Sequence, residues 1–367
     1  MKVFIKIGPH PQYKEIVKYP PKGVKYEVEG GTNIQKYYSP LTAKQRDYAR
    51  KIFHFFGLPR ISLYKTDADL IFSTRGTLPI TTKPWIVEFE HPYSFTWISY
   101  KNFGWRERKI TSFFLSRKNC KRILPNSTAA YSALLNSFDT KSFREKIEIL
   151  YLAIHYRKIR KIKHEKFRML TITSGVYDRG FNIVKDIYPE LKRKYDVEWV
   201  IKTVYPLKPE DEEFAKENSI KLIYGFLPQK KIDELYGSSD LFLYPSFVDT
   251  NAIVIYEAMR AGIPVITTDT FAFPDKVKPY YNGLMIHDPG VFWNKKFMQV
   301  IPVPDTSKYH NQAMSSELLS DIEYLIKNEK ERKKMGKNAE RMIKDGPLSV
   351  KVRNEKLKRI FEEALRR

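Results

Sequence analysis

The sequence has little cysteine, little glycine and no long run of apolar residues. Among its 367 residues there is one cysteine, Cys120, which excludes an intramolecular disulfide and a cysteine-based zinc site. Its 16 glycines follow no fixed period, so neither a solenoid nor a propeller is expected. No stretch approaches the roughly 18 apolar residues of a membrane helix, and Lys6 interrupts the short apolar start. We therefore expect a soluble, cytoplasmic protein, peripheral at most to the inner face of a membrane.

Several catalytic signatures are also missing. The seven histidines show no HExxH pattern or paired spacing, which argues against a zinc peptidase. Neither a P-loop nor a GxGxxG motif occurs, which argues against kinases and dinucleotide-dependent dehydrogenases. The acidic triplet DAD at 67–69 precedes the apolar LIFS, so it is read as the start of a buried strand rather than a metal site. No metal and no cofactor is predicted.

Positive charge is the strongest compositional feature. The net charge is +23, and residues 1–165 carry 31 Lys and Arg against 13 Asp and Glu, a net +18. Such a field attracts polyanions such as nucleic acid, anionic lipid or phosphate-bearing substrates. A Lys-rich surface that only aids solubility is the plainer reading. The densest basic run, RKIRKIKHEKFR at 157–168, lies where the two halves meet.

The order of apolar segments predicts an α/β protein with two doubly wound domains. From residue 167 onward, strand and helix patterns alternate at least four times, from FRMLTITSG to PVITTD. Such repeats imply a parallel sheet covered by helices on both faces. The first half carries similar short runs, including KIEILYLAI at 146–154, read as a buried strand. We place one domain at 1–165, a second at 166–346, and a final amphipathic helix at 347–367.

Two acids eight residues apart stand between two apolar strands. Asp249 lies near the start of a predicted helix, and Glu257 lies about two turns along it, on roughly the same face. Free backbone N–H groups at Thr250, Asn251 and Ala252 would suit phosphate or sugar oxygens. Glu257 would accept two hydrogen bonds from a diol such as a ribose. The plainer reading makes Asp249 a helix cap and Glu257 a surface carboxylate.

The stretch that holds these acids reads PSFVD, then seven residues, then EAMRAGIPVI. It closely resembles the signature of family 4 glycosyltransferases. IKLIYGFLPQKKIDELYGSSDLFLYPS and LLSDIEYLIKNEKERKKMGKNAERMIKD also resemble the family's base-binding loop and its C-terminal helices. The resemblance covers roughly 168–345 and is weak over 1–167. It implies that 1–165 is an acceptor-binding domain, that 166–346 is a donor-binding domain, and that the helix at 347–367 packs back toward the first domain. It implies the GT-B fold, with two Rossmann-like domains facing across a cleft, and a retaining, metal-independent transfer from a nucleotide-sugar donor, UDP- or GDP-linked.

The resemblance also implies roles for individual residues. Glu257 would bind the ribose hydroxyls, and Asp249, where the family has glutamate, would lie beside the donor sugar as a catalytic residue. Ala252 stands where the family has glycine. Phe226 belongs to the base-binding loop, and Gly8 would let backbone amides approach the donor phosphates.

The phosphate-binding loop, GVYDRG, departs from the family pattern. Gly175 is kept, Val176 replaces an arginine, and Arg179, which can bind a diphosphate bidentately, replaces a lysine. Lys202, near the end of its strand, is the candidate for the second cation, or else a surface lysine. His91 follows a strand end, like a family histidine that contacts the donor sugar, although a lone histidine is more often structural.

The predicted function is hexosyl transfer to an acceptor that would be an anionic lipid, a glycan, a protein or DNA. Peripheral membrane contact would come through the basic first half. One alternative is a DNA-modifying glucosyltransferase. Another is a non-catalytic basic protein that binds nucleic acid or membranes on a transferase scaffold, which Val176 and the shortened acid Asp249 favour.

Overall fold

The computed structural model describes residues 1–6, 11–28, 48, 51–53, 55–96, 104–300 and 302–366. The chain divides into two compact units. Unit 1 consists of Met1–Ala153, Lys296–Met298 and Val350–Arg367, and unit 2 of Ile154–Lys295 and Gln299–Ser349. Residues 154–165, which the sequence placed with the first domain, therefore belong to unit 2. Among the residues described, no helix combines the length and the apolar character needed to cross a bilayer.

Unit 1 is built on a parallel sheet whose described strands number five, in the order β2-β1-β4-β6-β7. This is one of the two common doubly wound orders. The strands are β1 (Lys2–Ile5), β2 (Lys25–Val28), β4 (Leu70–Ser73), β6 (Trp85–Phe89) and β7 (Cys120–Pro125). A separate pair joins β3 (Ile61–Leu63) to β5 (Leu78–Ile80), and the helices are α1 (Pro11–Lys18), α3 (Trp105–Ser116), α4 (Thr128–Ser137) and α12 (Val350–Leu365).

The last helix completes the core of unit 1. Residues at helical spacing on α12 give it one apolar stripe, made of Leu357, Ile360, Phe361 and Ala364. This stripe packs into the same buried cluster as strand residues from β1 and β4, such as Val3 and Phe72. The final helix and the first strand of the chain are therefore parts of one core.

Unit 2 is built on a second parallel sheet, with described strands in the order β10-β9-β8-β11-β12-β13. Numbered along the unit, this is the 3-2-1-4-5-6 order of the Rossmann fold, with a switch point between β8 and β11. The strands are β8 (Phe167–Ile172), β9 (Val197–Thr203), β10 (Lys221–Tyr224), β11 (Leu241–Tyr244), β12 (Val265–Thr268) and β13 (Gly283–Ile286).

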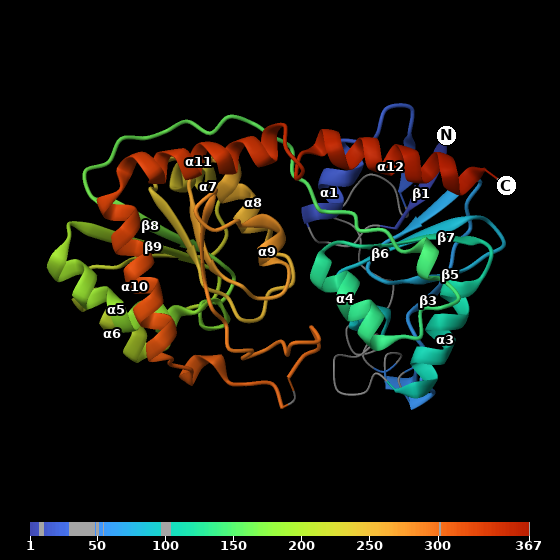
Figure 1. Cartoon of the computed structure of the whole chain (residues 1–367), viewed down its shortest axis with the longest axis horizontal. Coiled ribbons are helices and arrows are strands. Elements are labelled where there is room, and N and C mark those ends of the chain that lie inside the picture. Colours follow the sequence, from blue (N-terminus) through green and yellow to red (C-terminus); the bar gives the residue numbers. More distant parts are fainter. Residues whose placement is uncertain are drawn as a thin grey trace. The chain divides into compact units, whose positions relative to one another are not determined.

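Helices cover both faces of the unit 2 sheet, as the alternating pattern predicted. They are α5 (Phe181–Lys194), α6 (Pro209–Glu217), α7 (Gln229–Gly237), α8 (Ile253–Arg260), α9 (Phe273–Lys276), α10 (Gln312–Lys327) and α11 (Glu329–Lys344). Figure 1 shows α5 and α6 on one side of the sheet and α7 and α8 on the other. This is the arrangement that right-handed crossovers impose when the strand order reverses.

Two local predictions were wrong. The run at 146–154 forms no strand, although Glu148 N–H donates to the Ile123 carbonyl at 3.0 Å and Leu150 N–H to the Pro125 carbonyl at 2.9 Å. It lies beside β7, with Leu150, Leu152, Ala153 and Ile154 buried and its other apolar side chains half-buried. The sequence SSEL at 315–318 has a capping pattern that predicts a helix start there, but α10 begins earlier, because the Asn311 side chain accepts from Met314 N–H at 3.1 Å.

Candidate active site

The loops after β8 and β11 meet at the switch point of unit 2. Gly180, which ends the loop after β8, has φ +75°, and a Cβ placed on it would lie 2.3 Å from the Pro245 carbonyl oxygen. Only glycine allows this approach. The Asp178 carbonyl accepts from Phe247 N–H and from the Ser246 hydroxyl, each at 3.1 Å. The two loops are therefore fastened together by backbone contacts.

This fastening brings together two predicted site residues, Arg179 and Asp249. The Arg179 Nη2 atom lies 3.4 Å from the Asp249 Oδ2 atom, and both side chains are largely buried. The guanidinium also lies over the Tyr244 ring, 5.8 Å from its centroid. Burial would lower the pKa of Arg179, but Tyr244 and Asp249 outweigh it and raise that pKa. Arg179 is thus held as a cation at the switch point.

Asp249 is held on both of its oxygens. Its Oδ2 accepts from the Tyr244 hydroxyl at 2.7 Å, and its Oδ1 from Asn251 N–H at 3.3 Å and Ala252 N–H at 3.2 Å. Burial acts to raise the pKa of Asp249, but Arg179 and these donors bring it below its ordinary value. Asp249 is therefore a carboxylate that orders the start of α8.

These bonds correct one prediction about the loop. The N–H groups of Asn251 and Ala252 were expected to be free for a ligand, yet both donate to Asp249. The reason is local, because an Asp side chain reaches the amides two and three residues further on. Ala252 adopts φ +39°, a left-handed conformation that glycine occupies more easily.

Buried polar atoms without hydrogen-bond partners also lie beside the start of α8. Within the described residues, Nε and Nη1 of Arg179 and both amide atoms of Asn251 are buried and make no hydrogen bond. Asn251 is 4% exposed. Buried polar groups are normally satisfied, and each one left unpaired costs about 1–3 kcal/mol. At a helix N-terminus, such groups are ready to bind an anion or a hydroxyl.

Glu257 lies on α8 and accepts a hydrogen bond from the Tyr236 hydroxyl at 3.2 Å. Burial raises the pKa of Glu257, although the nearby Arg260 acts in the opposite direction. Arg260 also lies 4.0 Å from Asp233 of α7. The neighbouring helix α7 therefore positions the Glu257 carboxylate through the Tyr236 hydroxyl.

Sequence reasoning missed Tyr236, Tyr244 and Arg260. Tyr244 ends β11 directly before the Pro-Ser that was recognised, and Arg260 stands inside EAMRAG. Their positions therefore carried a signal. The sequence did not indicate their roles, because contacts such as Tyr236 with Glu257 and Arg260 with Asp233 form only in the folded chain.

Two further candidates lie side by side at the ends of β9 and β10. The Lys202 ammonium is 5.9 Å from the centroid of the Phe226 ring. Lys202 is 6% exposed, and burial lowers its pKa, whereas Phe226 is 88% exposed. In the loop after β8, a Cβ on Gly175 would have no neighbour closer than 4.0 Å, so the fold itself does not require glycine there.

The remaining candidates belong to unit 1. Gly8 lies outside the described residues. His91 is buried and makes hydrogen bonds through both ring nitrogens, with Nε2 2.8 Å from the Phe297 carbonyl and Nδ1 accepting from Tyr93 N–H at 3.3 Å. Burial lowers the pKa of His91 to about 4, so the ring is neutral. Its role toward a donor stays a prediction.

Comparison with known proteins fits this geometry. The family model described as Glycosyl transferases group 1 matches residues 154–292, which contain every unit 2 candidate. Residues 154–292 are therefore similar to a group 1 glycosyltransferase domain. Lipopolysaccharide glucosyltransferase WaaG of Escherichia coli is 27% identical over 140 residues, 36% of this chain and 36% of WaaG. A glycosyltransferase of Methanocaldococcus jannaschii is 21% identical over 137 residues, 36% of this chain and 35% of the relative.

These sequence matches span only about a third of each relative, but the structural likeness extends over the whole chain. HepE of Anabaena, solved in complex with UDP-glucose, has a TM-score of 0.65 and 13% identity, covering 99% of each chain. The fold is therefore the GT-B fold of two Rossmann-like domains, as predicted. None of these proteins supports the DNA-modifying or the non-catalytic alternative.

Proposed function

We propose that the protein is a metal-independent, retaining hexosyltransferase that uses a nucleotide-sugar donor, with the donor bound at the switch point of unit 2. The observation that carries this proposal is the group of buried, unpartnered polar atoms on Arg179 and Asn251 at the N-terminus of α8. The family match of this domain and the UDP-glucose complex of HepE support a sugar linked to UDP. A GDP-linked sugar is the other candidate.

The donor diphosphate would lie against Arg179. Its Nε and Nη1 have no hydrogen-bond partner among the residues that the structure describes, so a diphosphate there would replace no hydrogen bond seen in it. Lys202 is the second cation, because it is nearly buried and makes no ion pair within the described part of the chain. Cations fixed at a developing negative charge stabilise the transition state without reorganising.

Glu257 would hold the ribose diol, and the exposed Phe226 ring would pack against the base. A carboxylate accepts two hydrogen bonds, and Tyr236 occupies one oxygen of Glu257, so acceptor capacity remains for a diol. An aromatic ring that is 88% exposed offers a large apolar face to a planar base.

Asp249 would act as a positioning residue, since its contacts are with Arg179, Tyr244 and the α8 backbone. Asn251 would meet the sugar, because its amide supplies both a donor and an acceptor. This assigns to Asn251 the sugar contact that the sequence assigned to Asp249.

In the reaction, an acceptor hydroxyl forms the new bond to the anomeric carbon on the face from which the diphosphate departs. The bond between that carbon and the diphosphate oxygen breaks, and the departing diphosphate takes the hydroxyl proton. Arg179 stabilises the charge that builds up on the diphosphate.

Glu257→Ala tests the proposal. We expect transfer or hydrolysis of UDP- and GDP-sugars to fall at least a hundredfold, while Glu217→Ala, an exposed change on α6, keeps wild-type rates. Wild-type turnover in Glu257→Ala would contradict the donor site. No donor turnover by the wild-type protein would contradict catalysis altogether.

A further inference from the structure

A basic groove on unit 2 is lined by none of the residues proposed to touch the donor, although its Asp233 also lies 4.0 Å from Arg260, the neighbour of Glu257. The strap, residues 157–163, runs along the outside of unit 2 (green, at the top of that unit in Figure 1). With Lys230, Asp233 and Glu234 of α7, it encloses a groove of about 770 Å³. Pockets for small ligands measure about 300–1,000 Å³, so the groove has the size of a binding site.

The strap is fixed in place along its length. Ile162 N–H donates to the Gly237 carbonyl at 2.9 Å. A Cβ on Gly237 would lie 2.2 Å from the Arg160 carbonyl oxygen, so glycine is required for the strap to lie this close to α7. Ile159 is buried beside Gly237, with 8% of its surface exposed. The groove is therefore formed before any ligand arrives.

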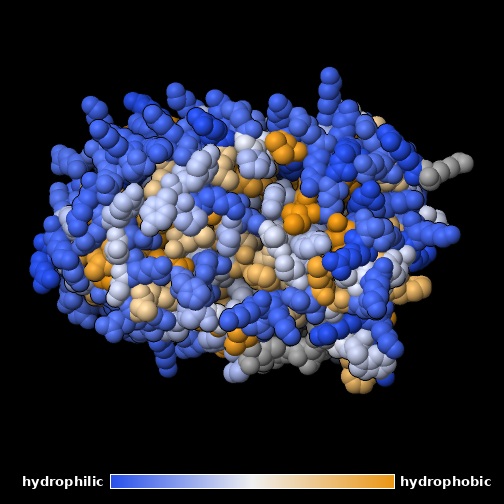
Figure 2. Space-filling model, viewed as in Figure 1, coloured by the Kyte–Doolittle hydropathy of each residue, from blue (hydrophilic) through white to orange (hydrophobic). Residues whose placement is uncertain are grey.

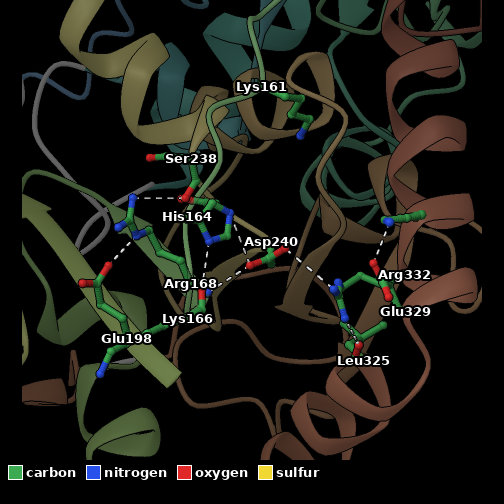
Figure 3. Close-up of polar contacts among 12 residues, drawn as sticks. Lys161, His164, Lys166, Arg168, Glu198, Ser238, Asp240, Leu325, Glu329 and Arg332 are labelled. Carbon is green, nitrogen blue, oxygen red and sulfur yellow. Dashed lines mark hydrogen bonds and ion pairs between the residues drawn. The ribbon is translucent and has the colours of Figure 1, made fainter. Parts of the chain in front are cut away.

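Polar contacts hold both ends of the strap. At its start, Arg157 pairs with Asp233. Just beyond its end, His164 Nε2 lies 3.5 Å from Asp240, which also lies 3.7 Å from Arg332 (Figure 3). Asp240 further accepts from Arg168 N–H at 3.0 Å, which ties the strap to the start of β8.

The cations of the groove outnumber its available acids. Asp233 is paired with Arg157, and Glu234 with Lys231 at 2.8 Å. Figure 2 shows hydrophilic side chains along this rim of unit 2. Four exposed side chains that line the groove make neither an ion pair nor a hydrogen bond within the described residues, and these are Lys158, Arg160, Lys163 and Lys230. A fifth, Lys161, donates to the Gly262 carbonyl at 3.4 Å.

We propose that the groove binds a ligand carrying at least two phosphate groups. A single phosphate monoester carries a charge of about −1.5 to −2 near neutral pH, so four unpaired cations match two such groups. Three of these four cations, Lys158, Arg160 and Lys163, lie on the strap and span at most about 16 Å, at about 3.3 Å per residue, which suits a ligand with two phosphate groups. A phosphorylated lipid headgroup and a free phosphorylated compound present the same chemistry.

The test compares two triple charge reversals, K158E/K163E/K230E in the groove and K221E/K330E/K337E on exposed sites elsewhere in unit 2. Both change the net charge equally. Each is made in the full chain with Arg179→Ala, as is the reference protein, so the candidate donor site does not contribute. One arm titrates inorganic tripolyphosphate by calorimetry. The other measures cosedimentation with phosphatidylcholine vesicles, with and without phosphatidylinositol bisphosphate.

We expect the groove variant to bind at least tenfold more weakly than the reference, and the control variant to match the reference. Such a loss with tripolyphosphate alone identifies a free compound, whereas a loss on bisphosphate vesicles, with or without a loss in the other arm, identifies a headgroup. Absence of binding by the reference in both arms, or equal losses in both variants, would overturn the proposal. Because no donor is present, the result is independent of the proposed transfer.

Discussion

The two units have the same doubly wound architecture. They differ in whether a buried charged group near the carboxyl ends of the strands has its hydrogen bonds satisfied within the protein. In unit 1, Glu88 of β6 accepts from the Tyr13 hydroxyl at 3.2 Å, Arg75 N–H at 3.3 Å and the Asn126 amide at 3.4 Å. In unit 2, two nitrogen atoms of Arg179, Nε and Nη1, have no hydrogen-bond partner among the described residues. A protein that satisfies a buried group gains stability, and one that leaves it unpaired loses stability unless a ligand binds. The contrast favours a structural role for Glu88 and a binding role for Arg179.

Removing Arg179 should have the largest effect on this contrast. In Arg179→Ala we expect transfer to fall about a hundred- to a thousandfold, the size seen when one charge-stabilising donor is removed. The free energy of unfolding should also fall, by about 3 kcal/mol at most, because Asp249 loses its counter-charge at 3.4 Å whereas Nε and Nη1 made no hydrogen bond among the described residues. Rates of donor turnover and urea unfolding measure the two effects.

Arg168→Ala is the matched control. Arg168 pairs with Glu198 and donates to the Ser238 carbonyl at 3.2 Å (Figure 3). Because its contacts are satisfied within the protein, this variant should lose stability and keep its turnover. If Arg179→Ala instead unfolds easily and stays active, the contrast between the units is wrong.

Glu88→Gln tests the other side of the comparison through pH. Burial, with a smaller effect of Glu90, raises the pKa of Glu88 to about 7. In the unfolded chain this carboxyl has a pKa near 4.5. The stability that protonated Glu88 contributes is therefore fully present below pH 4.5 and is lost as the pH rises to about 7. The loss should be about 3 kcal/mol, at 1.36 kcal/mol per pH unit.

In Glu88→Gln this pH-dependent part of the unfolding free energy should vanish. The difference in unfolding free energy between wild type and variant, measured by urea titration from pH 4 to pH 8, should change by about that amount. A pH-independent difference would show that Glu88 is not the group responsible.

Two glycines of one loop should respond in opposite ways. Gly180→Ala should destabilise the protein by about 2–3 kcal/mol, since its Cβ meets the Pro245 carbonyl and its φ is left-handed. Gly175→Ala should leave stability within about 0.5 kcal/mol but raise the KM for the donor, because its Cβ would point into open space. Thermal unfolding and donor kinetics separate the two. A destabilised Gly175→Ala would mean that the loop, not a ligand, requires this glycine.

Tyr244→Phe should have the smallest effect. The variant loses the hydroxyl that Asp249 accepts at 2.7 Å, which should cost about 1 kcal/mol of stability. The same hydroxyl helps to hold the pKa of Asp249 below its ordinary value, so that pKa should rise. The acid limb of the transfer profile should then move to higher pH. An unmoved acid limb would show that Asp249 does not position Arg179 through its charge.

Much of unit 2 could be predicted from sequence because its elements are local. Each βα unit shows its own hydrophobic periodicity. The spacing of Asp249 and Glu257 predicts where the two residues lie relative to α8. The segment 146–154 was misread because burial produces the same apolar run whether or not a ladder of hydrogen bonds forms. The bonds from Asn251 and Ala252 to Asp249 depend on one loop conformation, which composition does not encode.

The sequence predicted less of unit 1 for the same reason. Its core unites strands from the start of the chain with α12 at the end. The family resemblance implied that the last helix packs on the first domain, but no local pattern indicates which side chains meet, such as Val3 with Phe361. The Glu88 cluster likewise gathers partners from three separate segments. Periodicity identifies elements, whereas the fold alone decides which polar groups meet.

The central claim is that the switch point of unit 2 binds the diphosphate of a nucleotide through Arg179. Calorimetric titration of UDP into the full chain tests it most directly, with wild type, Arg179→Ala and Arg168→Ala compared. We predict saturable binding by the wild type, the same affinity in Arg168→Ala, and at least tenfold weaker binding in Arg179→Ala. Equal affinities in all three proteins, or no binding by the wild type, would contradict the claim.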